Sequence, residues 1–349
     1  MARDPADGFD GTRALEMAVG ALNGLVGDYL HRTKNGLATE MEIVRWAAPA
    51  APSEAADATP AVRVGEGRLP VTREGLAEAL AGARLSPRIA VFVHGLMSTE
   101  DIWRGAPGES YGELLARDLG VASFEVRFNS GLRISQNGEH LDALMEQLVS
   151  NFPVPVEEVA MIGHSLGGLV IRAAHHAASE RGSSWLGLCR RAFYLGSPHL
   201  GAPLERFGNV LTWALKKIPN PITELIADIV NLRSAGVKDL RYGNLRREDW
   251  EGADADALLQ NLRHPVPLSP NVRHHLVVGS LSRDLESAVL FGDMLVPVRS
   301  AAGRAVAADR SPVFPAEHVA VFPGFHHLRL AHDPEVYTRL RAWAEEPLR

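Results

Sequence analysis

Cysteine is nearly absent from this chain of 349 residues, in which Cys189 is the single example. No disulfide can therefore form within the chain, and zinc sites built on pairs of cysteines are excluded. We expect a protein of a reducing compartment. Cys189 stands in an arginine-rich stretch with no histidine or other base near it in the sequence, so we expect an inert thiol.

Long uninterrupted apolar stretches are also missing. The most apolar part of the N-terminal region, between Glu16 and Asp28, holds only 11 uncharged residues, whereas about 20 are needed to span a bilayer. The chain opens with Met-Ala-Arg-Asp-Pro-Ala-Asp, whose acids and proline differ from the basic start and apolar run of a secretory signal. We expect no transmembrane helix and a cytoplasmic location.

An excess of positive charge is absent too. Lys and Arg number 36 against 42 for Asp and Glu, which gives a formal net charge of −6. This balance argues against a surface that coats nucleic acid. The chain is 46% hydrophobic and 22% charged, a composition that is typical of a packed globular protein and far from that of disordered chains.

The N-terminal region resembles an extension followed by a connector. Residues 12–30 place apolar side chains at helical spacing, which predicts a docked amphipathic helix. Gly20 and Gly24 are small residues four positions apart that permit close packing of this helix, with contact to a membrane surface as the alternative. Residues 47–60 are rich in Ala and Pro without an apolar period, which is typical of a flexible connector.

The extension at 1–60 is followed by a main domain at 61–349, in which short apolar runs alternate with helical patterns. Candidate strands lie at 88–93, 121–128, 158–162, 192–195, 274–278 and 318–322, and helical patterns lie at 112–118, 139–149, 166–179 and 334–346. This alternation predicts an α/β fold with a mainly parallel sheet flanked by helices, in which chemistry collects at the carboxyl ends of the strands. Residues 204–270 break the alternation and predict an inserted helical cap.

The motif that carries chemistry is GHSLGG at 163–168, which places G-x-S-x-G between a predicted strand and a predicted helix. A serine on such a tight turn has strained backbone geometry, and flanking glycines keep the turn free of side-chain clashes. Ser165 is then presented above the sheet as a nucleophile. A serine needs a base, and the base needs a carboxylate to orient it, so both should follow in the order serine, acid, histidine.

Two later regions supply candidates for these roles. For the acid, Asp293 stands in a G-D-x-x-V-P setting on a glycine-flanked loop, and Asp284 and Asp309 are the alternatives. For the base, His326 and His327 stand side by side after the last predicted strand. Both regions follow strands, as the chain order of a serine hydrolase requires.

The oxyanion that forms during acyl transfer needs two backbone N–H donors. One donor should come from the residue after the nucleophile, Leu166. The other should lie on a loop after an early strand, where VFVHGL ends in His94, Gly95 and Leu96. Leu96 is the expected second donor. Gly95 lets the backbone approach the reacting carbonyl closely, and His94 shapes the loop.

Five motifs, in order, relate this chain to a known family. They are VFVHGL, GHSLGG, GSPHLGAP, GDMLVPVRSA and HLRLAHDPEVY, within residues 86–345. Together they resemble the α/β-hydrolase superfamily, and within it the lipase- and esterase-like group that includes hydrolases similar to GPI inositol deacylases. The resemblance implies an α/β-hydrolase fold. We expect no cofactor and no metal, because the paired histidines lack carboxylate partners at metal-ligand spacing.

Residue by residue, the resemblance implies a catalytic triad of Ser165, Asp293 and His327, with Leu96 and Leu166 as the donors of the oxyanion hole. The residues expected to shape the site are His94, Gly95, His164 and His199. For the base, the H-L-x-L pattern ahead of D-P-E-V favours His327 over its neighbour.

These expectations predict a serine esterase or lipase of lipid metabolism that cleaves carboxylic esters through an acyl-enzyme. The apolar interval at 204–270 favours a lipid-like or hydrophobic acyl ester as substrate. The alternatives are an acyltransferase or a GPI- or inositol-type deacylase with the same triad, and a non-catalytic protein that binds lipid or a partner. Peripheral membrane contact and the oligomeric state stay open.

Overall fold

The computed structural model of the chain describes residues 11–51, 62–105, 108–202, 234–251, 264–280 and 312–348. Its α-helices are α1 (Gly11–Arg32), α2 (Arg73–Ala79), α3 (Tyr111–Leu119), α4 (Ile134–Asn151), α5 (Leu166–Arg181), α8 (Ala235–Tyr242) and α11 (Pro334–Glu345). Its strands are β1 (Glu42–Pro49), β2 (Val62–Leu69), β3 (Arg88–Val93), β4 (Ala122–Arg127), β5 (Glu158–His164), β6 (Cys189–Leu195), β7 (Arg273–Ser280) and β8 (Val319–Pro323). Its short 3-10 helices are η1 (Glu100–Trp103), η2 (Ser184–Gly187), η4 (Arg247–Asp249), η6 (Ala316–His318) and η7 (His327–Ala331).

The strands of the described residues form one eight-stranded sheet in the order β2-β1-β4-β3-β5-β6-β7-β8. The strands from β3 to β8 run parallel to one another, whereas β1 is antiparallel to β4 and β2 is antiparallel to β1. Strand β5 lies in the interior between β3 and β6. The carboxyl ends of the parallel strands therefore meet at one edge of the sheet, where ligand sites of such sheets lie.

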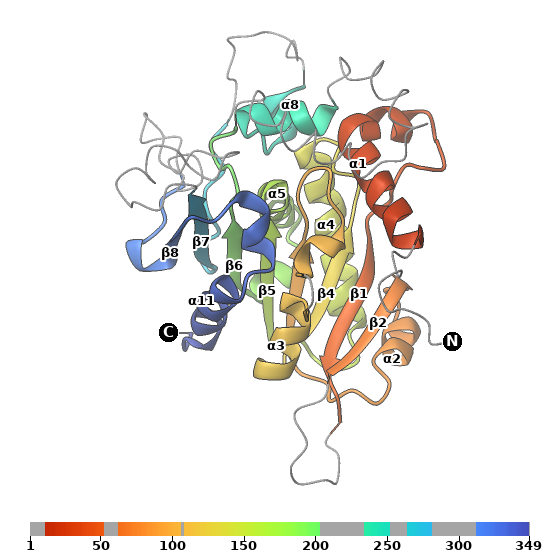
Figure 1. The fold of residues 1–349 in the computed structure, drawn as a ribbon, viewed down its shortest axis with the longest axis vertical. Coiled ribbons are helices and arrows are strands. Elements are labelled where there is room, and N and C mark those ends of the chain that lie inside the picture. The colour runs from red at the N-terminus through yellow and green to blue at the C-terminus, as the bar shows by residue number, and fades with distance from the viewer. Residues whose placement is uncertain are drawn as a thin grey trace, which may run out of the picture.

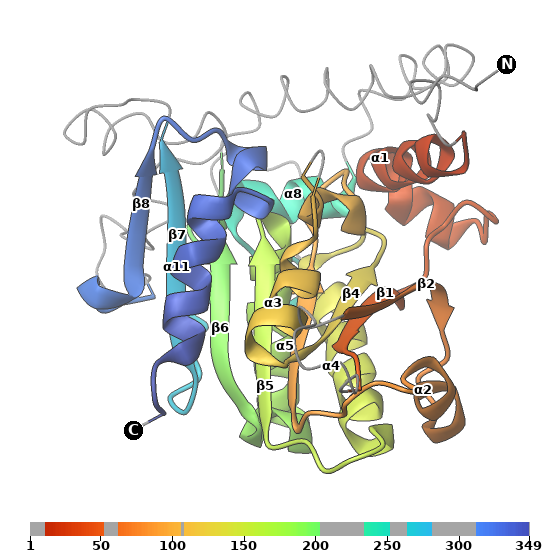
Figure 2. The same ribbon diagram turned by 60° about the horizontal axis from the view of Figure 1, so that its bottom comes forward.

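Helices cover both faces of the sheet. Helices α3 and α11 lie on one face, and α4 and α5 lie on the other (Figures 1 and 2). Helices α1 and α8 lie at the end of the sheet where β5 and β6 finish (Figure 2). Among the helices that the structure describes, none is both long and apolar enough to cross a membrane.

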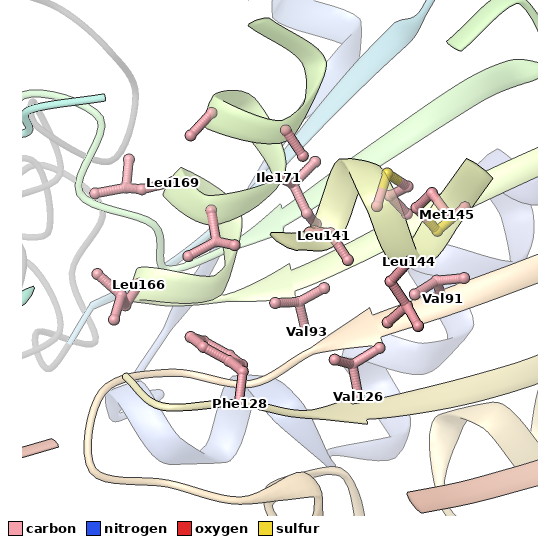
Figure 3. Close-up of a cluster of buried hydrophobic side chains, with 14 of the residues drawn as sticks. Val91, Val93, Val126, Phe128, Leu141, Leu144, Met145, Leu166, Leu169 and Ile171 are labelled. Atoms are coloured by element: carbon pink, nitrogen blue, oxygen red, sulfur yellow. The ribbon is translucent and has the colours of Figure 1, made fainter. Parts of the chain in front are cut away.

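The core divides into two clusters because successive side chains of a strand point to opposite faces. Val91 and Val93 belong to the cluster beneath α4 and α5, whereas Ala90 and Phe92 belong to the cluster beneath α3 and α11. Figure 3 shows the first cluster, in which strand side chains meet α4 and α5. Its labelled members are Val91, Val93, Val126, Phe128, Leu141, Leu144, Met145, Leu166, Leu169 and Ile171. Most of them are fully buried.

This architecture is that of the α/β-hydrolase fold, with a mainly parallel sheet, helices on both faces and a sharp turn from β5 into α5. The predicted fold class is confirmed. Each of the six predicted strands coincides with a strand of the sheet, and the four helical patterns of the main domain coincide with α3, α4, α5 and α11. Val-, Ile- and Phe-rich runs were a sufficient signal because most of these strands are buried on both faces, although the edge strand β8 is only partly buried.

The N-terminal region differs from its prediction. The helix at 12–30 is present as α1, but β1 takes up the first three residues of the predicted connector at 47–60 and lies between β2 and β4. Ala47 and Ala48 are buried there. Residues 52–61 lie outside the described residues. The predicted boundary between the extension and the main domain therefore separates two neighbouring strands of one sheet.

A buried ion-pair cluster ties this N-terminal strand to the rest of the sheet. Arg45 of β1 donates to Glu125 of β4 at 2.8 Å and to Asp101 of η1 at 3.1 Å, and all three side chains are buried. Removing one partner of such a cluster leaves an uncompensated buried charge, which costs about 3–5 kcal/mol. Strand β1 is thus an integral part of the folded domain.

The predicted cap at 204–270 is described at 234–251 and 264–270, where α8 and η4 lie. Buried Asp239 of α8 pairs with Arg133 at 2.7 Å and accepts a hydrogen bond from the Ile134 N–H at 3.0 Å. It therefore satisfies a free N–H at the start of α4. The predicted helical stretches at 210–217 and 221–232 lie outside the described residues.

Candidate active site

Ser165 occupies the turn between β5 and α5 at the carboxyl edge of the sheet. Its φ of 53° and ψ of −121° are strained for a residue with a side chain, at a cost of about 1–3 kcal/mol. The turn is held because the Ser165 N–H donates to the carbonyl oxygen of Leu195, at the end of β6, at 2.9 Å. The side chain stands at the cap position of α5 but makes no capping hydrogen bond. Its hydroxyl is therefore not used to support the helix.

The glycines of the motif are required by close packing. A methyl group on Gly163 would come within 2.5 Å of Gly168 N, and one on Gly167 would come within 2.1 Å of the Val93 carbonyl oxygen. Real carbon atoms do not approach that closely, so a larger residue would displace the turn or the neighbouring strand. The motif glycines thus let β5 reverse into α5 directly against β3.

His327 lies beside this turn, at the first residue of η7. A methyl group on Gly196, which directly follows Leu195, would come within 2.9 Å of His327 Nδ1. The ring of His327 also lies 4.6 Å from that of His164, measured between centroids. His327 and Ser165 therefore both lie next to the end of β6.

The two adjacent histidines point to different environments. His327 is 4% exposed, whereas His326 is exposed and accepts a hydrogen bond from the Arg329 N–H on its Nδ1 at 3.3 Å. His326 therefore caps η7 from outside, and His327 faces the interior of the site. The sequence favours His327 only through the H-L-x-L pattern of the resemblance, and it contains no direct sign of this difference in burial.

His164 supports the loop that carries His327. Its Nε2–H donates to the carbonyl oxygen of His327 at 3.0 Å, across 163 positions of the sequence. Burial, reinforced by the neighbouring His327, holds the pKa of His164 well below its usual value. His164 is therefore neutral and acts as a hydrogen-bond donor to the first residue of η7.

The two expected oxyanion donors lie on either side of Ser165. Leu166 is the first residue of α5, whose first four N–H groups lack partners within the helix and carry the positive end of the helix dipole. Gly95 approaches from the end of β3, and a methyl group on it would lie 3.0 Å from Ser165 Cβ. Leu96 follows directly and is 7% exposed. Gly95 thus lets the loop after β3 lie directly against Ser165.

His94 orients the loop through two hydrogen bonds. Its Nδ1 lies 2.9 Å from the Gly95 carbonyl oxygen, and its Nε2 accepts from the Phe128 N–H at 3.3 Å. The ring stacks on Phe128 at 4.3 Å, and burial lowers the pKa of His94 to about 4. The imidazole is therefore neutral, with its proton on Nδ1. Because a trans peptide points its C=O and N–H in opposite directions, holding the Gly95 carbonyl also aims the Leu96 N–H.

Two residues that support this loop were not predicted from the sequence, namely Met97 within it and Ser130 after β4. Met97 has a φ of 56°, an uncommon conformation for a residue with a side chain, and its N–H donates to Ser130 Oγ at 3.1 Å. Ser130 follows β4, 33 positions away. No sequence signal marks either residue, because the contact arises only when the loops after β3 and β4 are brought together.

His199 is buried inside the loop that follows β6. Its ring packs edge-to-face on Tyr194 at 4.9 Å, and its Nδ1 lies 3.5 Å from Arg172 Nη1. At 1% exposure it is a packing position beneath the loop rather than an open surface. His199 was expected to shape the site, and that role stays a prediction.

Asp293 lies outside the described residues, as do the alternatives Asp284 and Asp309. The strand that precedes Asp293 in the sequence, β7, is described and pairs with β6. Beyond that pairing, the Gly196 N–H donates to the Val277 carbonyl oxygen at 2.8 Å. The role of Asp293 stays a prediction.

Cys189 is buried, which agrees with the inert thiol expected from the sequence. The sequence places no histidine near it, but His175 Nε2 lies 3.6 Å from its Sγ. Burial raises the pKa of the Cys189 thiol to about 12, so the thiol stays protonated at neutral pH. Within the described part of the chain, no group of three or more His, Cys, Asp or Glu side chains is arranged to hold a metal ion.

No protein-family model and no curated protein matches this chain. Among solved structures, it is similar to the mature form of the lipase BlEst2 from Bacillus licheniformis, with 16% identity, a TM-score of 0.46, and coverage of 73% of this chain and 91% of that chain. It is also similar to the esterase Pf2001 from Pyrococcus furiosus, with 15% identity, a TM-score of 0.42, and coverage of 74% and 81%. The naproxen esterase (carboxylesterase NP) from Bacillus subtilis has 15% identity, a TM-score of 0.40, and coverage of 74% and 84%.

Proposed function

We propose that this protein is a serine hydrolase that cleaves carboxylic esters through an acyl-enzyme on Ser165. The observation that carries the proposal is the strained turn of Ser165 at the end of β5, with the buried ring of His327 beside it. A buried serine in an unfavourable conformation, with its hydroxyl not used for capping, is costly to maintain, and strain of this kind concentrates at functional sites. The general arrangement is that of a nucleophile elbow.

In the acylation step, Ser165 Oγ attacks the ester carbonyl carbon while His327 takes the hydroxyl proton. The carbonyl oxygen becomes an oxyanion that accepts hydrogen bonds from the N–H groups of Leu96 and Leu166. Collapse of this intermediate breaks the bond to the alcohol, which leaves with the proton from His327. Asp293 is the proposed partner that orients the imidazole and stabilises its charged form.

In the deacylation step, water takes the place of the alcohol. His327 removes a proton from the water, whose oxygen attacks the acyl carbon, and the same two N–H groups stabilise the second oxyanion. The carboxylic acid leaves as Ser165 recovers its proton from His327. The cycle consumes one ester and one water and returns one alcohol and one acid.

The acyl group of the proposed substrate is hydrophobic. Residues 204–270 contain many Leu, Ile and Val residues together with Trp213. In the sequence, this interval stands between β6 and β7. Apolar side chains around a mainly apolar pocket favour acyl chains over charged groups. A series of p-nitrophenyl esters with increasing acyl length tests this: kcat/KM should rise from acetate toward longer chains, and a preference for acetate would contradict a hydrophobic pocket.

Covalent labelling with a fluorophosphonate tests the mechanism directly. The folded wild-type protein should gain one adduct, and peptide mass spectrometry should locate it on Ser165. Ser165→Ala should abolish both the adduct and ester turnover while the circular dichroism spectrum stays unchanged.

Ser184→Ala is the matched control, because Ser184 is an exposed serine on η2 whose hydroxyl bonds Glu146. This variant should label and turn over like the wild type. An unlabelled wild-type protein, or an adduct that persists in Ser165→Ala, would overturn the proposed nucleophile.

A further inference from the structure

Helix α1 packs its glycine face directly on the loop that carries the second oxyanion donor. A methyl group on Gly24 would lie 2.5 Å from Met97 Cγ, 2.7 Å from its backbone N and 2.8 Å from its Cα. One turn earlier, a methyl group on Gly20 would lie 2.5 Å from Thr99 Cγ2 and 3.1 Å from the Ser98 carbonyl oxygen. The helix backbone therefore lies against residues 97–99, immediately after Leu96.

The Met97 backbone that Gly24 contacts is in an unfavourable conformation. Its φ is 56°, and its N–H is held by Ser130 Oγ at 3.1 Å. Two neighbouring peptides thus flank Leu96, one held by His94 through the Gly95 carbonyl and the other held by Ser130. Helix α1 lies directly against this second peptide, because Met97 N and Cα are among the atoms nearest to Gly24.

The helix is itself fixed from two further sides. The Gly24 carbonyl oxygen accepts a hydrogen bond from Ser234 Oγ, at the start of α8, at 2.7 Å. The Gly27 carbonyl oxygen accepts one from Asn129 Nδ2 at 2.9 Å, in the loop after β4. Gly131 of that loop approaches the helix so closely that a methyl group on it would lie 2.1 Å from the Asn23 carbonyl oxygen.

We propose that α1 is a positioning element of the oxyanion hole, with Gly24 as its positioning residue. The helix holds Met97 in its left-handed conformation and thereby fixes the position of the Leu96 N–H relative to Ser165. The proposal rests on the proposed function, since it assigns the helix to the same reaction. It gives the glycines of the N-terminal helix a partner, which the sequence spacing alone does not identify.

The expected effect follows from the chemistry of the oxyanion. Loss of one oxyanion donor costs about 10²- to 10³-fold in kcat. Ala at position 24 would push the Met97 backbone by a few tenths of an ångström or more, because N and Cα cannot move aside by rotating a side chain. We therefore expect Gly24→Ala to lower kcat about 10- to 100-fold, with KM changed little because the ground-state ester does not yet carry the oxyanion.

The experiment compares three glycines of the same helix. Gly24→Ala contacts Met97, Gly20→Ala meets a rotatable threonine side chain, and Gly11→Ala meets nothing within 4 Å. We expect the loss in kcat to be largest at 24, several-fold at 20 and absent at 11. Each kcat is divided by the number of active sites, counted from the burst of p-nitrophenol or from stoichiometric fluorophosphonate labelling.

Counting the active sites distinguishes a positioning role of Gly24 from an effect of its substitution on folding. A purely structural defect lowers the number of labelled sites but leaves the rate per site unchanged, and that result would overturn the proposal. An unchanged kcat in folded Gly24→Ala would overturn it too. If Gly24→Ala does not fold, the test uses Gly20→Ala instead. A rate per active site in Gly20→Ala equal to that of the wild type would then reject the proposal. Failure of the wild type itself to label would instead reject the proposed function.

Discussion

The two turns that face each other across the site are held in different ways. The turn of Ser165 depends on the glycines of its own six-residue motif and on the strands beside it, with the Ser165 N–H bonded to Leu195. The turn of Leu96 depends on residues far along the chain, namely Phe128 and Ser130 after β4 and Gly24 of α1.

The turn of Ser165 is therefore supported by residues near it in the sequence, whereas the turn of Leu96 is supported by residues far from it. The turn of Ser165 is strained, but the glycines of its motif prevent steric clashes there because they have no side chain. The loop of Leu96 carries a strained Met97 without a glycine in its place, and two other segments, the loop after β4 and α1, contact that residue. Changes at a distance should therefore damage the oxyanion loop while leaving the nucleophile turn intact.

The largest expected effect lies on the nucleophile side. His327→Gln removes the base, and kcat should fall about 10⁴-fold or more, because the serine hydroxyl is a poor nucleophile without one. Its matched partner is His326→Gln, which changes an exposed side chain that caps η7. Steady-state kinetics on a p-nitrophenyl ester measures both.

His326→Gln should lose less than about threefold, consistent with a surface cap. Equal losses of kcat in the two variants would mean that the different burial of His326 and His327 has no effect on catalysis. A dominant loss in His326→Gln would reassign the base.

The next effect concerns the acid that orients the base. Asp293→Asn should lower kcat about 10³-fold, since a misoriented imidazole in the wrong tautomer cannot accept the serine proton well. Asp284→Asn is the matched variant in the same stretch of sequence and should retain activity. The same kinetic assay compares them, and reversal of the two results would transfer the role to Asp284.

A smaller effect is expected on the oxyanion side. His94→Phe keeps a ring to stack on Phe128 but loses the hydrogen bonds to the Gly95 carbonyl and from the Phe128 N–H. The Leu96 N–H then loses its fixed direction, and kcat should fall about 10- to 100-fold with little change in KM. A change in KM alone would show that the ring affects substrate binding instead.

The pH dependence of stability provides the control for this variant. Burial lowers the pKa of His94 to about 4, below the value near 6.5 of an unfolded chain. The stability that the neutral ring contributes is therefore fully present above about pH 6.5 and is lost as the pH falls toward 4, because only the unfolded chain takes up the proton. In urea unfolding, the free energy of unfolding should fall less steeply with decreasing pH in His94→Phe than in the wild type. The two slopes should differ by up to about 1.4 kcal/mol per pH unit. Identical slopes would contradict a buried, neutral His94.

Much of the fold follows from patterns that act over short distances. Strands β3 to β7 were predictable because buried parallel strands are rich in apolar residues, and β8 was predictable from its Val-Ala-Val-Phe run although it is only partly buried. Strands β1 and β2 were not. β2 is mostly exposed and reads Val-Arg-Val-Gly-Glu-Gly-Arg-Leu, and β1 places a buried Arg45 beside small alanines. Their stability comes from pairing and from the Arg45 ion pairs, which no local pattern reveals.

By itself, the sequence determined the position of Ser165, because the glycines around it permit a turn that few other residues allow, and it placed the strands whose apolar side chains must be buried. Only the tertiary structure decided that His327 is buried while His326 is exposed, what holds Met97, and where the glycine face of α1 lies. Those outcomes depend on contacts between segments tens to hundreds of residues apart. Such contacts form only when burial of the core brings the segments together, so they leave no periodic or local signal in the chain.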